Sequence, residues 1–130
     1  MKIILQGETP SKKNSRILNT KTKRSFPSSR YVEWHDLAIL QVRSQLKGWK
    51  APVPCSIRVM FFHGDKNRRD SDNAMSSILD MLKDSGTITD DCWKYIPHLE
   101  SWNFYDKGNA RCVIDISELK TGNPESTTPT

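Results

Sequence analysis

The fold is decided by residues 55–84, which read CSIRVMFFHGDKNRRDSDNAMSSILDMLKD. Over residues 55–63, apolar side chains alternate with the others at a period of two, which predicts a strand with one buried face. Between Asn73 and Asp84, apolar residues recur at spacings of three and four, and this period predicts a helix. The apolar positions of that helix are Met75, Ile78, Leu79 and Leu82. Gly86 is suited to the left-handed cap that ends it.

The chain before this stretch predicts one strand, one long loop and one helix. Residues 2–6 have the pattern of a short strand, and residues 7–30 form a polar loop rich in Ser, Asn, Lys and Arg. Residues 31–49 carry an apolar stripe at helical spacing, with Ser28 or Ser29 as the candidate N-cap.

The chain after it predicts two more strands. Residues 93–105 contain a strand that Pro97 places at a sheet edge or a bulge, and residues 110–116 form the last strand. The order β-α-β-α-β-β is typical of an α+β fold, a small mixed β-sheet with helices packed against it. We expect a single domain over residues 1–120 and a disordered C-terminal tail over residues 121–130.

Composition excludes several classes of protein. The 130 residues are 35% hydrophobic and 27% charged, which is typical of a soluble globular domain. Because no apolar run approaches about 18 residues, a transmembrane protein is excluded, and the short apolar start predicts a cytoplasmic protein. The three cysteines, Cys55, Cys92 and Cys112, form no CxxC pair, so a zinc ribbon or redox motif is not expected.

Charge is distributed unevenly along the chain. Residues 1–50 hold eleven Lys and Arg against three acids, a net +8, whereas residues 51–100 hold six against eight acids, a net −2. A basic first third next to an acidic middle indicates a polyanion held near carboxylates, and nucleic acid is the usual polyanion. A basic surface without such a partner is the alternative.

Asp70 and Asp72 form the sharpest chemical motif. They lie two residues apart between the predicted strand and helix, and in extended chain such side chains point to the same side. Two carboxylates about 4 Å apart repel by roughly 4 kcal/mol at a surface-like dielectric, and a cation between them removes this cost. Carboxylate oxygens favour Mg²⁺ or Mn²⁺ over zinc. The alternative is that Asp72 only caps the helix.

A second acidic pair, Asp90 and Asp91, follows the predicted helix after a short loop. If the strand in residues 93–105 starts beside the end of the strand over 55–63, Asp91 falls near Asp70 and Asp72. Three carboxylates then meet at one site. The alternative is that the pair only shapes a turn.

The run RRDSDNAMSSILDMLKDSGTITDD, residues 68–91, resembles the signature of the RusA family of Holliday-junction resolvases. That signature has a D-x-D-N that opens a helix, an I-L-D-x-L core, a Gly and a closing D-D. The matching residues are Asp70, Asp72, Asn73, Ile78, Leu79, Asp80, Leu82, Gly86, Asp90 and Asp91. Residues 7–16, GETPSKKNSR, are also similar to the N-terminal loop of the family.

The resemblance implies a homodimeric, Mg²⁺-dependent endodeoxyribonuclease, bacterial or phage-encoded, that cuts four-way DNA junctions in recombination and repair. It implies that Asp70, Asp72 and Asp91 are catalytic and bind the metal, with Asp90 beside them. Mn²⁺ is the expected substitute ion. A four-way junction has near two-fold symmetry, which also favours a symmetric dimer with two active sites.

Basic and polar residues on both sides of the acidic motif are the expected DNA contacts, because such side chains bind the phosphate backbone without reading sequence. The candidates are Lys12, Lys13, Asn14, Arg16, Lys21, Lys23, Arg24, Arg68, Arg69 and Asn73.

Two other functions remain open. The family usually has a Lys three residues after the Asn, and this chain has Ser76 there. That departure favours a catalytically weak or inactive branched-DNA-binding protein of the same fold. Because charge and carboxylates do not specify branching, a nuclease specific for flaps or forks is the other alternative.

Overall fold

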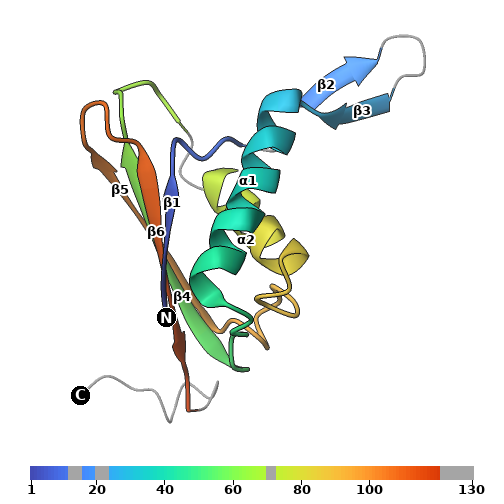
Figure 1. Cartoon of the computed structure of the whole chain (residues 1–130), viewed down its shortest axis with the longest axis vertical. Helices are drawn as coiled ribbons and strands as arrows, with labels where there is room; N and C mark the ends of the chain where they lie inside the picture. Colours follow the sequence, from blue (N-terminus) through green and yellow to red (C-terminus); the bar gives the residue numbers. More distant parts are fainter. Residues whose placement is uncertain (12–15, 20–23, 70–72, 121–130) are drawn as a thin grey trace.

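A four-stranded mixed sheet, covered on one face by two helices, forms the body of this computed structural model (Figure 1). The structure describes residues 1–11, 16–19, 24–69 and 73–120. The elements are β1 (Lys2–Gln6), β2 (Arg16–Asn19), β3 (Arg24–Pro27), α1 (Ser29–Leu46), β4 (Cys55–His63), α2 (Asn73–Asp84), β5 (His98–Tyr105) and β6 (Arg111–Glu118).

The strands of the main sheet lie in the order β1-β6-β4-β5. β6 pairs antiparallel with both β1 and β4, whereas β5 pairs parallel with β4. The sheet with its two helices confirms the predicted α+β class and the predicted order of its elements. β5 lies at an edge of the sheet, as Pro97 predicted.

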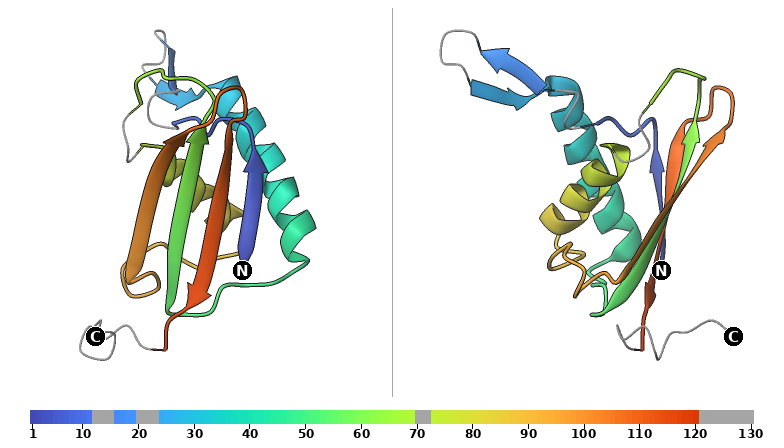
Figure 2. Two further views of the ribbon diagram at one scale, coloured as in Figure 1. Left: turned by 90° about the vertical axis from the view of Figure 1, so that its left-hand side faces the viewer. Right: turned by 180° about the vertical axis from the view of Figure 1, so that it is seen from behind.

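The core lies between the sheet and the helices. Ile57, Val59 and Phe61 of β4 are almost completely buried, and they face Ile78 and Leu82 of the predicted apolar stripe in the same core. Both helices pack on this one face, so the other face of the sheet has no helical layer (Figure 2). In the part of the chain that the structure describes, neither helix has the length and hydropathy needed to span a membrane.

The two helices are joined by polar contacts as well as by the core. His35 Nε2 of α1 lies 2.7 Å from Asp84 Oδ2 of α2. Burial, together with the charges of Asp80 and Asp84, raises the pKa of Tyr31 on α1 to about 12. Asp80 and Asp84 therefore lie on the side of α2 that faces α1.

Local sequence explains the helix ends. The Ser28 hydroxyl accepts a hydrogen bond from the Tyr31 amide, which confirms the first of the two predicted N-caps. α1 ends at Leu46, three residues earlier than predicted, because Lys47 takes a left-handed conformation with φ of 50°. Gly86, with φ of 81°, takes the left-handed conformation predicted after α2.

The prediction of a continuous loop over residues 7–30 is wrong. β2 and β3 pair as an antiparallel hairpin within it, and this hairpin lies beyond the N-terminal end of α1, away from the main sheet (Figure 1). The sequences of β2 and β3, RILN and RSFP, do not alternate strictly between apolar and polar residues, so the period of two that marks a strand is missing. The strand predicted within residues 93–105 is confined to β5, and the last strand, β6, continues two residues past its predicted end.

Side-chain amides of α1 cover the outer edge of β1. Gln45 Oε1 accepts from the Ile4 amide at 2.8 Å, and Gln45 Nε2 donates to the Ile4 carbonyl at 2.7 Å. Gln41 Oε1 accepts from the Gln6 amide at 3.0 Å. An edge strand otherwise presents unpaired backbone groups to other chains, so these two side chains close that edge.

Replacing Gln45 with Ala should destabilise the fold although the side chain is exposed, because it leaves two backbone groups of Ile4 without their partners. We expect a loss of about 1–2 kcal/mol in the free energy of unfolding, measured by urea denaturation. Ser44→Ala, an exposed neighbour on the same helix, is the matched control and should change stability by less than about 0.5 kcal/mol. Equal stability of the two variants would contradict the edge-capping role.

Candidate functional site

The segment that leads from β4 to α2 begins at a tight backbone junction. The His63 carbonyl accepts from the Asp106 amide at 2.9 Å, and the Gly64 carbonyl accepts from the Gly108 amide at 3.0 Å. A Cβ atom at Gly64 would lie 3.3 Å from both Ala110 Cβ and Ala110 N, so this position favours glycine. The turn between β5 and β6 therefore fixes where the segment starts.

Arg69 is held at the other end of this segment. Its Nη1 donates to Asp65 Oδ1 at 2.8 Å and its Nη2 donates to Asp65 Oδ2 at 3.2 Å, a bidentate ion pair. Nη1 also donates to the Asn67 carbonyl, and the Asn67 amide donates to Asp65 Oδ1 at 2.9 Å. These bonds fold residues 65–69 into a closed turn immediately before Asp70.

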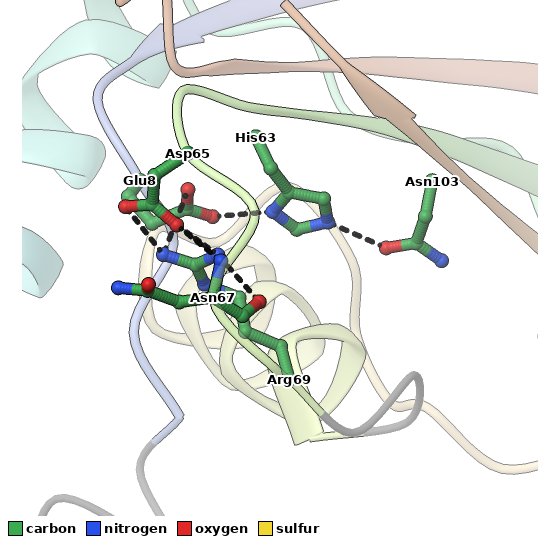
Figure 3. Close-up of polar contacts among 6 residues, drawn as sticks. All are labelled: Glu8, His63, Asp65, Asn67, Arg69 and Asn103. Atoms are coloured by element: carbon green, nitrogen blue, oxygen red, sulfur yellow. Dashed lines mark hydrogen bonds and ion pairs between the residues drawn. The ribbon is translucent and has the colours of Figure 1, made fainter. Parts of the chain in front are cut away.

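Glu8 and His63 connect this turn to the sheet (Figure 3). Glu8 Oε2 lies 2.7 Å from His63 Nδ1, and Glu8 Oε1 lies 3.4 Å from Arg69 Nη2. On its other side, His63 Nε2 lies 2.8 Å from Asn103 Oδ1 of β5. The side chains of Glu8 and His63 are only 17% and 15% exposed, so this is a mostly buried polar cluster.

The predicted metal-binding carboxylates fall in two places. Asp70 and Asp72 lie outside the described residues, between Arg69 and the start of α2. Asp91 lies beside the last turn of α2, with Oδ1 3.7 Å from Lys83 Nζ. A 2.8 Å hydrogen bond from the Asp91 amide to Asp90 Oδ1 lowers the pKa of the Asp90 carboxyl.

The expected start of the strand in residues 93–105 beside the end of β4 is wrong. β5 is parallel to β4, and its first residue, His98, pairs with Ser56 at the beginning of β4. Asp90 and Asp91 therefore precede β5 at the end of the sheet where β4 begins, whereas His63 lies at the other end, where β4 finishes. Lys83 is ten residues into α2, a rise of about 15 Å from its first residue. The described part of the chain thus places Asp91 far from Arg69.

The predicted DNA-binding residues are also divided. Lys12, Lys13, Asn14, Lys21 and Lys23 lie outside the described residues. Arg16 is the first residue of β2, Arg24 is the first of β3 and Asn73 is the first of α2. Arg68 is exposed, whereas the guanidinium of its neighbour Arg69 is bonded to Asp65.

Within the described ranges, no group of three or more His, Cys, Asp or Glu side chains is arranged to hold a metal ion. Neither Glu8 nor His63 is among the residues that the sequence predicts for the site. No local signal could have joined them, since they are 55 residues apart in sequence.

A basic α+β domain that carries an acidic segment at the entrance of a helix belongs to a class typical of enzymes that act on nucleic-acid phosphates. The sequence model of the family Endodeoxyribonuclease RusA matches residues 7–117, and the chain belongs to this family. It is also 28% identical over 115 residues to a protein of Aquifex aeolicus (strain VF5) named crossover junction endodeoxyribonuclease RusA. That match covers 88% of this chain and 90% of the relative.

The closed turn should respond to acid. The hydrogen bonds from Arg69 and from the Asn67 amide hold the pKa of Asp65 below its ordinary value of 3.8. A lowered folded pKa stabilises the turn above the unfolded value, and this contribution is lost as pH falls through the folded pKa. We expect Arg69→Gln to return the Asp65 pKa toward 3.8, measured by carboxyl-carbon NMR titration. An Asp65 pKa unchanged by Arg69→Gln would show that the ion pair does not form in solution.

Proposed function

We propose that this protein is a metal-dependent endonuclease that resolves four-way DNA junctions by paired phosphodiester hydrolysis. The observation that carries the proposal is the family match over residues 7–117, which includes the acidic segment and the basic N-terminal part of the chain. The relative from Aquifex aeolicus, whose name specifies crossover junctions, supports the choice of substrate.

The donor set fits a hard divalent cation. Asp70, Asp72 and Asp91, with Asp90 beside them, offer only carboxylate oxygens, which are the ligands that Mg²⁺ and Mn²⁺ prefer. When bound, the ion supplies charge stabilisation for the phosphate and lowers the pKa of the attacking water. The role of the protein is to hold these carboxylates in place. Without the ion, these acids repel the phosphodiester.

We propose that two copies of the chain complete each site. Carboxylates that share one Mg²⁺ bind it at about 2.1 Å, so they cannot act together from opposite ends of α2. A two-fold axis that sets α2 antiparallel to its copy brings Asp91 of one chain to the start of α2 in the other. This arrangement also supplies the two sites needed for two symmetric cuts.

The β2–β3 hairpin is the proposed DNA arm. It extends beyond the N-terminal end of α1 (Figure 1), and seven of the candidate DNA contacts lie on it or in the residues beside it. Contacts of this kind neutralise backbone phosphates, so junction affinity should fall steeply with salt. Arg68, exposed next to the acidic segment, is the proposed contact nearest to the cleaved phosphate.

Cleavage of a labelled four-way junction tests the function. We expect symmetric cuts in Mg²⁺ or Mn²⁺, no cuts in EDTA, and no cuts in the matching linear duplex. Asp70→Asn should lose cleavage by at least about a hundredfold and keep its junction affinity, because it removes a metal ligand and no DNA contact. Cleavage by Asp70→Asn at the wild-type rate would exclude Asp70 from the site.

Mixing two inactive variants tests whether the site is shared between copies. A heterodimer of Asp70→Asn with Asp91→Asn contains one site with both aspartates intact if the site is shared. An equal mixture should then recover about a quarter of the wild-type sites, seen as nicking of one strand. Asp70→Asn mixed with Asp72→Asn is the matched control and should stay inactive. No recovery in the first mixture would place Asp91 in its own chain's site.

The same assay decides between the remaining functions. Ser76 is exposed in α2, at a position where the family usually has a Lys. Junction binding without cleavage in either metal would indicate a DNA-binding protein that is inactive because it lacks the family's lysine at this position. Cutting of flaps or forks at least as fast as junctions would indicate a different branched substrate.

A further inference from the structure

We infer that Glu8 and His63 are positioning residues for the metal-binding segment, acting through Arg69. This inference rests on the proposed function for the role of Asp70 and Asp72. The contacts that carry it lie entirely in described residues: the Glu8–His63 pair, the Glu8–Arg69 pair and the Asp65–Arg69 clamp.

In its described residues, the segment has no apolar anchor of its own. Asp65, Lys66, Asn67 and Arg68 are all exposed, although Lys66 Nζ lies over the Tyr105 ring of β5 at 5.0 Å from its centroid. Among residues 65–69, Arg69 alone is partly buried, with its side chain 27% exposed. Polar contacts of Arg69 therefore determine how the chain approaches Asp70.

The Asp65 clamp alone cannot fix that approach, because both of its partners belong to the same turn. The two residues are four apart in the chain and the Asp65 side chain is 52% exposed, so this pair closes the turn without attaching it to another element. Glu8 differs in both respects. It comes from the chain after β1 and its side chain is only 17% exposed. Glu8 thus ties the closed turn to the sheet through a mostly buried carboxylate, whereas the other side-chain contact of the turn with the sheet comes from the exposed Lys66, over the Tyr105 ring.

His63 in turn holds Glu8. Both ring nitrogens of His63 face acceptor oxygens, Glu8 Oε2 at 2.7 Å and Asn103 Oδ1 at 2.8 Å. A ring nitrogen that carries a proton donates to the oxygen it faces. One carboxylate oxygen of Glu8, Oε2, therefore contacts His63. The other, Oε1, is buried and lies 3.4 Å from Arg69 Nη2, and no described residue donates a hydrogen bond to it. β4, β5 and the chain after β1 are joined in this way to the residue before Asp70.

Contacts of this type behind metal ligands commonly govern metal affinity by fixing the orientation of the ligands. Glu8→Gln is the sharpest test, since it keeps the shape and an acceptor for His63 but turns an uncharged amide toward the Arg69 guanidinium. Glu8→Asp keeps the charge and is the conservative variant. Glu100→Gln is the matched control, because it makes the same substitution at a 25% exposed carboxylate of β5 that pairs with Arg58 and accepts from Trp102 Nε1, without a contact to the segment.

The experiment measures Mn²⁺ affinity by electron paramagnetic resonance and amide hydrogen exchange of residues 64–74. We expect Glu8→Gln to weaken Mn²⁺ binding about tenfold and to speed exchange in the segment. Glu8→Asp should recover part of both effects, and Glu100→Gln should remain within about twofold of the wild type. Circular dichroism melting of all three variants controls for folding. Wild-type Mn²⁺ affinity and exchange in Glu8→Gln would overturn the inference.

The two proposals fail in different ways. If the wild-type protein binds no Mn²⁺, the metal site of the proposed function is wrong, and hydrogen exchange alone decides whether Glu8 orders the segment. If the wild type binds Mn²⁺ and cuts junctions while Glu8→Gln does so equally well, the positioning role is wrong and the function stands.

Discussion

The parallel pairing of β4 with β5 is the constraint on which the rest of the structure depends. A chain that leaves one strand and enters a parallel neighbour must cross the length of the sheet, and here α2 makes that crossing. Its apolar stripe buries Ile78 and Leu82 against β4 as it does so. The segment after β4 and the segment before β5 are thereby held at opposite ends of one helix.

This separation places Arg69, the residue before one acidic motif, and Lys83, which contacts Asp91 of the other, near opposite ends of α2. The rise of about 15 Å between the start of α2 and Lys83 is a property of helix geometry, not of side-chain choice. In the proposed dimer, a two-fold axis would bring Asp91 of one copy to the start of α2 in the other without any change in the fold, and this symmetry matches that of the proposed substrate.

The sequence predicts the centre of this fold well and its long-range contacts poorly. The bounds of β4 and α2 agree with the prediction, because a period of two and a spacing of three and four are local and both elements bury a full stripe. The direction of β5 was missed, because residues 93–105 have the same pattern whether the strand runs parallel or antiparallel to β4. The β2–β3 hairpin was missed because RILN and RSFP do not alternate strictly between apolar and polar residues. The acidic motif itself could be found from spacing alone, whereas the link from Glu8 to His63 spans 55 residues and exists only once β1 and β4 share a sheet.

Charge near the acidic segment is divided between two neighbouring arginines with different surroundings. Arg68 is exposed, while Arg69 is paired with Asp65 and lies 3.4 Å from Glu8. A nuclease of this kind needs a cation that attracts phosphate, but an arginine that also pairs with the metal-binding carboxylates competes with the metal for them. Here Nη1 and Nη2 of Arg69 contact two other acids and the Asn67 carbonyl, so this guanidinium shapes the chain instead. The acids around Arg69 thus serve the carboxylates that follow it, although none of them is itself a proposed metal ligand.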